Sequence, residues 1–148
     1  MNDQKMNCSN VILIVDDNPT DAMLVREAFA CTDGNTEVFV AEDGVCALEF
    51  LRKQDPYLQA PRPDIILLDL NMPRKNGIEF LAEMKADIDL RIIPVIVYTS
   101  SVTDQDIKAA FQNYANGYIK KSVNFDECIE VAKSIKEFWF STSILCRS

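Results

Sequence analysis

Polar residues that suit phosphoryl chemistry follow several short apolar runs of the sequence. Asp16 and Asp17 follow the run VILIV, and Asp69 follows IILL. Thr99 comes directly after VIVY, and Lys121 lies just beyond the short run at residues 118–119. Because ligands of a parallel α/β sheet bind at the carboxyl ends of its strands, we expect these side chains to converge at one edge.

This set of residue types indicates a metal-assisted phosphoryl site. Clustered carboxylates repel one another, and their pKa values rise unless a cation neutralises them. Oxygen ligands without His or Cys favour a hard ion, and Mg²⁺ suits them best. A carboxylate can also attack phosphorus to give an aspartyl-phosphate, whose oxygens Lys121 and the hydroxyl of Thr99 would bind. Taken one at a time, the same residues also fit a solvated turn, a strand end or a surface charge.

Five short apolar runs alternate with five longer amphipathic ones, an order that predicts a (βα)₅ domain. The expected strands are residues 11–15, 37–41, 65–68, 95–98 and 118–119. The first, third and fourth runs are continuously apolar, as central parallel strands buried on both faces are. The second is less uniformly apolar and is expected at an edge. The predicted fold class is α/β, a doubly wound parallel five-stranded sheet with helices on both faces.

The helices between these runs begin at recognisable residues. Asn18 is an N-cap followed by Pro19 at the first helical position. Further helices are expected from about Gly44, over residues 77–87, after Thr103 and after Asn124. The fourth helix has an apolar stripe made of Ile107, Ala110, Phe111 and Tyr114.

The fifth helix is expected to run to about Phe140, with a buried stripe made of Cys128, Val131, Ala132, Ile135, Phe138 and Trp139. One stripe suffices for one core, which leaves three surplus apolar residues, Phe140, Ile144 and Leu145. Burying each would contribute about 1.5–3 kcal/mol. They predict self-association, and the alternative is a tail that folds back onto its own core.

Composition excludes several classes of function. A formal net charge of −8 argues against nucleic-acid binding. The absence of histidine removes Ser-His-Asp hydrolases and His-ligated metal centres. No apolar run nears the about 20 residues of a membrane span, and the N-terminus lacks the apolar segment of a secretory signal. The five cysteines lack a C-x-x-C pair and are expected to be reduced thiols, mostly in the core, of a cytoplasmic protein.

Four segments together resemble the receiver domain of two-component response regulators: VILIVDDNPTDAMLV, PDIILLDLNMPRKNG, PVIVYTSS and NGYIKKS. The resemblance covers about residues 11–140. It implies a flavodoxin-like strand order 2-1-3-4-5 and a switch that accepts a phosphoryl group from a sensor histidine kinase. It also implies that the protein is not a turnover enzyme, although it would catalyse its own phosphorylation and later dephosphorylation.

The same resemblance assigns roles to individual residues. Asp69 would be the phosphoacceptor, Lys121 would contact the phosphoryl group, and Thr99 and Tyr118 would form the switch pair. Mg²⁺ would be held by four residues: Asp16, Asp17, Asp69 and, through its backbone carbonyl, Asn71. One departure from the family pattern is Ser122, because most receivers have a proline after the lysine.

The resemblance is closer to one branch, the small single-domain regulators that partner cyanobacterial phytochrome kinases. The shared marks are the loop with Ala60-Pro61-Arg62-Pro63, the LLDLNMP run and a C-terminal FW. It implies a homodimer through the fourth helix, fifth strand and fifth helix. Residues 1–10 would be a tail, 11–140 the receiver and 141–148 an extension, with no output domain, so that output would come through protein contacts.

Three alternatives compete with this interpretation. A HAD-like aspartyl-phosphate phosphatase usually carries a second Asp two residues after the nucleophile, but Asn71 stands there and cannot transfer protons. A nucleotide- or flavin-binding module would need a phosphate-binding loop after the first strand, and the four glycines lie elsewhere. A degenerate receiver that acts only as a scaffold would be expected to lack part of the site, yet the set is intact.

Overall fold

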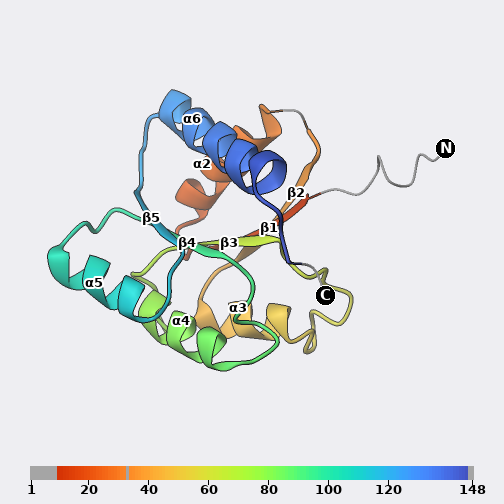
Figure 1. Cartoon of the computed structure of the whole chain (residues 1–148), viewed down its shortest axis with the longest axis vertical. Helices are drawn as coiled ribbons and strands as arrows, with labels where there is room; N and C mark the ends of the chain where they lie inside the picture. Colours follow the sequence, from red (N-terminus) through yellow and green to blue (C-terminus); the bar gives the residue numbers. More distant parts are fainter. Residues whose placement is uncertain (1–9, 33, 147–148) are drawn as a thin grey trace.

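The computed structural model describes residues 10–32 and 34–146, and its centre is one parallel sheet (Figure 1). The strands are β1 (Asn10–Val15), β2 (Thr36–Ala41), β3 (Ile65–Leu68), β4 (Val95–Thr99) and β5 (Gly117–Lys120). They lie in the order β2-β1-β3-β4-β5, and each neighbouring pair is parallel. The predicted fold class and strand order are confirmed, including the edge position of β2.

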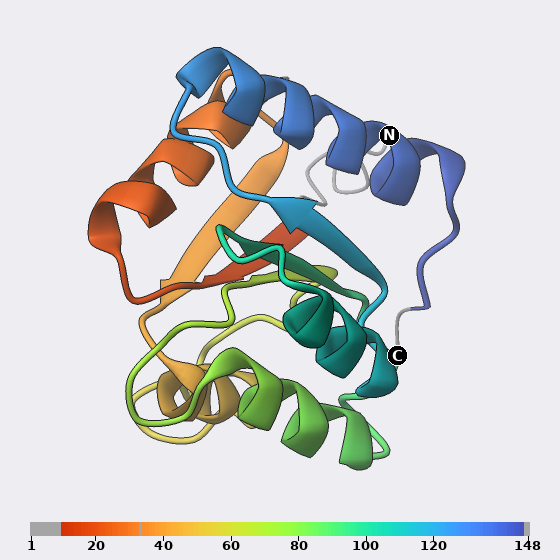
Figure 2. The same ribbon diagram turned by 90° about the vertical axis from the view of Figure 1, so that its left-hand side faces the viewer.

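Helices cover both faces of the sheet (Figures 1 and 2). One face carries α2 (Pro19–Ala30) and α6 (Phe125–Ile135). The other carries α3 (Gly44–Leu51), α4 (Gly77–Ala86) and α5 (Asp104–Gln112). Alternate residues of the central strands enter the two apolar clusters beneath these helices, so each central strand is buried on both sides. This double burial explains why their sequences are continuously apolar.

Side-chain caps fix where the helices begin. Asn18 accepts hydrogen bonds from the backbone N–H groups of Thr20 and Asp21. Thr103 and Asn124 each accept one from the residue three positions on. The three caps predicted from the sequence are therefore present. They place the first turn of each helix immediately after the carboxyl end of a strand, where ligands of this fold bind.

The last helix departs from the prediction after Ile135. A π-helical segment, η1 (Lys136–Thr142), follows α6 in place of an α-helix continuing to Phe140. A π-helical turn has i→i+5 hydrogen bonds and is wider than an α-helical one, so an α-helical period no longer predicts which side chains face inward. Phe138, predicted to be buried, is 53% exposed, whereas Phe140, predicted to be surplus, packs against the cluster under α6.

The predicted apolar stripe of the fourth helix also faces solvent in part. Ala110 is buried, but Phe111 is 47% exposed and Tyr114 is 73% exposed. The helix lies beside the edge strand β5, so a narrow part of it meets the core. Tyr114 lies beyond the helix end in a left-handed conformation (φ 68°), which takes it off the stripe. An apolar surface therefore remains beside β5.

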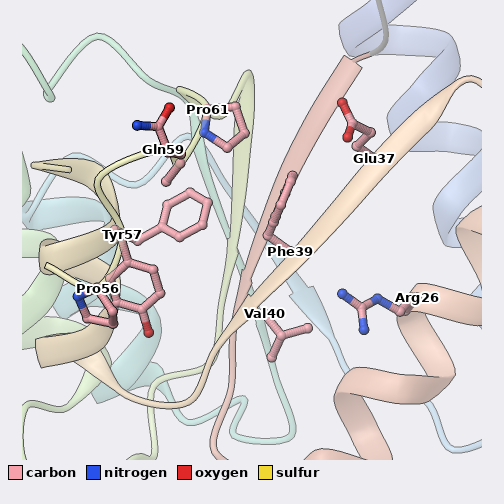
Figure 3. A pocket seen from close by; sticks show the side chains of 10 residues that line it. Arg26, Glu37, Phe39, Val40, Pro56, Tyr57, Gln59 and Pro61 are labelled. Carbon is pink, nitrogen blue, oxygen red and sulfur yellow. The ribbon is translucent and has the colours of Figure 1, made fainter. Parts of the chain in front are cut away.

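The proline-containing loop between α3 and β3 packs against the edge strand β2 (Figure 3). The ring centroids of Tyr57 and Phe50 are 5.5 Å apart, as are those of Phe50 and Phe39. With Pro61 these rings line an open hollow of about 680 Å³. The residues predicted to carry chemistry lie outside this hollow.

Among the described residues, the thiols of Cys31, Cys46, Cys128 and Cys146 are free. Cys128 is buried, but Cys31 and Cys146 are exposed, so the prediction of mostly core cysteines is wrong for these two. Cys8 lies outside the described residues. In the part of the chain that the structure describes, no helix is long and apolar enough to span a bilayer.

Candidate functional site

The carboxyl ends of four strands bring the predicted chemical residues together. Asp16 follows β1, Asp69 follows β3, Thr99 ends β4 and Lys121 follows β5. Nζ of Lys121 lies 2.8 Å from Oδ2 of Asp16 and 3.1 Å from Oδ2 of Asp69. The hydroxyl of Thr99 donates to Oδ1 of Asp69 at 2.8 Å. The convergence expected from the strand ends is therefore present.

Asp69 is a buried carboxylate with a donor at each oxygen. Oδ2 faces the ammonium of Lys121, and Oδ1 accepts from Thr99 and, at 3.3 Å, from the backbone N–H of Asn71. Hydrogen bonds to an ionised carboxylate are short and directional, so this set fixes the orientation of the side chain. Thr99 itself is fully buried, which holds its hydroxyl at this position.

Lys121 has a third carboxylate partner, Asp21, which the sequence did not predict. Oδ2 of Asp21, on the first turn of α2, lies 2.9 Å from Nζ of Lys121. Burial alone would lower the pKa of Lys121, but the hydrogen bonds to Asp16 and Asp21 outweigh it and raise that pKa. Lys121 is therefore firmly cationic. The available signal for Asp21 was its place three residues after the N-cap Asn18, at the same end of the sheet.

The acid pair and Asp69 form a group of potential metal ligands. One carboxylate oxygen from each of Asp16, Asp17 and Asp69 lies within 4.8 Å of the others. Asp16 and Asp69 are buried and Asp17 is exposed. Burial raises the pKa of Asp16, although the hydrogen bond from Lys121 opposes the rise. An all-oxygen set of this kind fits a hard divalent cation, which would offset the mutual repulsion of the carboxylates.

A second group of potential ligands, Glu42, Asp43 and Cys46, already holds a cation of the protein itself. Nε of Arg74 lies 2.7 Å from Oδ2 of Asp43, and Nη2 lies 3.3 Å from Sγ of Cys46. Burial would raise the pKa of Asp43, but the hydrogen bond from Arg74 helps to lower it below its ordinary value. This group therefore suits a metal less well than the first one does.

The loop from β3 to α4 is held tightly beside Asp69. A Cβ atom at Gly77 would lie 2.4 Å from the carbonyl oxygen of Asp69, so glycine is required there. Gly44, at the start of α3, donates its N–H to the carbonyl of Lys75 at 3.1 Å. Arg74 has a left-handed backbone (φ 62°), which is costly for a residue with a side chain, and its guanidinium is ion-paired with Asp43. These contacts fix the loop that carries Asn71.

Tyr118, the predicted switch partner of Thr99, lies on β5 and is partly exposed. Its hydroxyl donates to the backbone carbonyl of Ser101 at 2.7 Å, and its ring centroid is 6.4 Å from that of Phe111. Within the described residues the one cis peptide is Asp55–Pro56, so the bond between Lys121 and Ser122 is trans. The N–H of Lys121 donates to the carbonyl of Thr99 at 2.8 Å and anchors the backbone there.

The fold and the site define an α/β protein with an acid pair, a central aspartate, a hydroxyl and a lysine at the carboxyl edge of a parallel sheet. The model of the response regulator receiver domain matches residues 12–133. The chain belongs to this family, whose members are phosphoacceptor switches phosphorylated by histidine kinases and bind a divalent metal ion. Because the chain belongs to the receiver family, the alternative of a HAD-like phosphatase is not favoured.

The chain is similar to regulators of known structure over nearly all of its length. It is 40% identical over 139 residues to response regulator Rcp1 of Synechocystis sp.. The aligned region covers 94% of this chain and 95% of Rcp1. The crystal structure of the phosphorylated cyanobacterial phytochrome response regulator RcpA matches with a TM-score of 0.88 and 42% identity, covering 94% of this chain and 99% of RcpA. The Mn²⁺-bound form of Rcp1 matches with a TM-score of 0.84 and 39% identity, covering 93% and 99%.

Proposed function

We propose that Asp69 is the phosphoacceptor of this receiver. The observation that carries the proposal is the pair of contacts at its carboxylate, from Lys121 at 3.1 Å and from Thr99 at 2.8 Å. A carboxylate oxygen of Asp69 attacks the phosphorus of a kinase phosphohistidine, the phosphorus–nitrogen bond breaks, and the imidazole leaves. Lys121 and Thr99 then donate to oxygens of the transferred group and offset their charge.

The metal ion of this site is Mg²⁺, held by Asp16, Asp17, Asp69 and the backbone carbonyl of Asn71. When bound, it neutralises charge on the phosphoryl oxygens. Support comes from the close carboxylates in this chain and from the Mn²⁺-bound form of the relative Rcp1. Asp17 is exposed, so water reaches this side of the site, and the aspartyl-phosphate hydrolyses there to end the signal.

The phosphoryl donor is a sensor histidine kinase of the phytochrome class. This proposal is supported by the similarity to RcpA, a cyanobacterial phytochrome response regulator, over 94% of this chain. A similar structure at 33% identity is the bacteriophytochrome response regulator AtBRR, with a TM-score of 0.73. The activated protein signals through contacts with other proteins.

A second copy of the chain binds the face formed by α5, β5 and α6 with η1. Three of its apolar side chains, Phe111, Tyr114 and Phe138, are exposed. Beside Phe138 a groove of about 390 Å³ runs between β5 and the last helix, lined in part by Tyr118 and Ile119. A two-fold pair would place the same patch of both copies in contact and bury these side chains.

Acetyl phosphate tests the assignment of Asp69 without any kinase. Wild-type protein incubated with acetyl phosphate and Mg²⁺ should gain one phosphoryl group by intact-mass spectrometry, and Asp69→Asn should gain none. Asp64→Asn is the matched control, since Asp64 precedes β3 at the opposite end of the strand. A normal adduct on Asp69→Asn would refute the assignment.

A further inference from the structure

The ammonium of Lys121 is saturated by carboxylates. A lysine ammonium has three N–H donors, and Lys121 has three carboxylate partners: Asp16 at 2.8 Å, Asp21 at 2.9 Å and Asp69 at 3.1 Å. Only 9% of the side-chain surface of Lys121 is exposed, so water competes little for these donors. A phosphoryl oxygen that is to bind Lys121 must therefore displace or share one of these three acceptors.

Asp21 is the one partner without a role in the proposed phosphoryl chemistry. Asp69 is the proposed nucleophile, and Asp16 is a proposed metal ligand. Asp21 reaches Lys121 from the first turn of α2, where the cap Asn18 holds its backbone N–H at 3.1 Å. An acidic residue at this position also stabilises a helix by its charge, but Oδ2 of Asp21 is bound to an ammonium 100 residues away along the chain.

We propose that Asp21 is a positioning residue that restrains Lys121 and lowers the affinity of the site for a phosphoryl group. The inference rests on the proposed function of Asp69. Asp21 occupies one N–H of Lys121 and partly neutralises its charge, so less of that charge is available to phosphoryl oxygens. Only the ammonium of Lys121 separates the negative charge of Asp21 from the phosphoryl position, so Asp21 repels an anion that binds there. Both effects act in the same direction.

Beryllofluoride, a phosphoryl mimic, measures this affinity directly. The variant is Asp21→Asn, which keeps the shape and the hydrogen-bonding oxygen but removes the charge. Its dissociation constant for beryllofluoride at saturating Mg²⁺, followed by ¹⁹F NMR, should fall about twofold to fivefold, the size expected for losing one competing ion pair. Asp21→Ala should change it in the same direction. The control is Glu27→Gln, an exposed acid farther along α2, which should leave it unchanged.

Two further measurements test whether Asp21 acts through Lys121 and whether the Asp21→Asn variant is still correctly folded. Because Asp21 acts mainly through Lys121, Asp21→Asn should tighten binding much less in a Lys121→Gln background than in the wild-type background, and equal tightening in both backgrounds would overturn the lysine route. The Mg²⁺ affinity of Asp21→Asn should stay equal or fall slightly while beryllofluoride binding tightens. A damaged fold, or a metal ligand at Asp21, would instead weaken both.

The outcome separates this inference from the proposed function. If wild-type protein forms the beryllofluoride complex and Asp21→Asn binds it with unchanged or lower affinity, the role of Asp21 is wrong and that of Asp69 stands. If wild-type protein forms no such complex, the proposed function fails and this inference fails with it.

Discussion

The hydroxyl of Thr99 donates a 2.8 Å hydrogen bond to Oδ1 of Asp69, from the end of one central strand to the end of its neighbour. Thirty residues separate the two along the chain. Parallel pairing of β3 with β4 brings their carboxyl ends side by side, and both residues are buried. The hydroxyl is therefore already placed at the carboxylate that the proposed reaction phosphorylates.

Thr99→Val should slow phosphorylation by acetyl phosphate about tenfold or more, because a hydrogen bond to a charged group contributes about 1.5–3 kcal/mol. Thr99→Ser, which keeps the hydroxyl, should recover most of the rate. Ser100→Ala is the control at the exposed neighbouring position. The measurement is the initial rate of adduct formation by mass spectrometry, and a normal rate in Thr99→Val would contradict the role of the hydroxyl.

Mg²⁺ should stabilise the folded protein. At a hundredfold excess over its dissociation constant, the ion should add about 2.7 kcal/mol to the free energy of unfolding. Asp17→Asn should shift the effect to higher Mg²⁺ concentration and weaken labelling without abolishing it, because it removes one ligand. Thermal melts across a Mg²⁺ titration measure both, with Asp89→Asn as an exposed control. A wild-type melting temperature that saturating Mg²⁺ leaves unchanged would rule out the site.

Activation should move Tyr118. With beryllofluoride bound, we expect Thr99 to shift toward the phosphoryl mimic and Tyr118 to rotate inward, breaking its 2.7 Å bond to the carbonyl of Ser101. Crystal structures with and without beryllofluoride measure the change, and Tyr57, which packs against Phe50 outside the proposed interface, serves as the internal reference. Identical Thr99 and Tyr118 positions in both would show that Tyr118 is a fixed strand residue.

Breaking the ion pair between Arg74 and Asp43 should destabilise the fold in a pH-dependent way. Asp43 has a lowered pKa in the folded protein, so its contribution is complete above the ordinary value of 3.8 and is lost as the pH falls through the folded value. Arg74→Gln should therefore unfold at lower urea than wild type near neutral pH. The difference should shrink as the pH falls below 3.8.

Urea titrations of both proteins between neutral and acid pH measure this difference. Arg74→Lys should restore part of the stability, and Arg91→Gln is a matched exposed control. A gap between wild type and Arg74→Gln that stays constant down to acid pH would show that the ion pair is not its source.

Self-association should depend on the apolar side chains beside β5. Sedimentation velocity at micromolar concentration should show wild-type dimers in the presence of Mg²⁺ and beryllofluoride, and monomers for Phe138→Glu or Phe111→Glu. Met23→Glu alters a similarly exposed residue on α2, a helix that is not part of the proposed interface, and should leave the dimer intact. Wild-type protein that stays monomeric when activated would show that this face binds something else.

The sequence by itself determined the alternation of strands and helices, the edge position of β2 and the meeting of Asp16, Asp69, Thr99 and Lys121. Each of these follows from local pattern. A buried strand needs a continuous apolar run, a helix start needs a cap, and a parallel sheet gathers whatever follows its strands at one edge. For this reason the core of the site was predictable from strand ends alone.

The tertiary structure decided the features that depend on contacts between distant segments. The third acceptor of Lys121, Asp21, became visible only when the end of β5 was placed beside the first turn of α2. Likewise, the pairing of Arg74 with Asp43 joins a loop to the N-cap of α3, 31 residues earlier. The α-helical periodicity of the sequence also predicted the wrong burial for Phe138 and Phe140. The reason is that η1 changes the helical turn after Ile135 and with it the direction of each side chain.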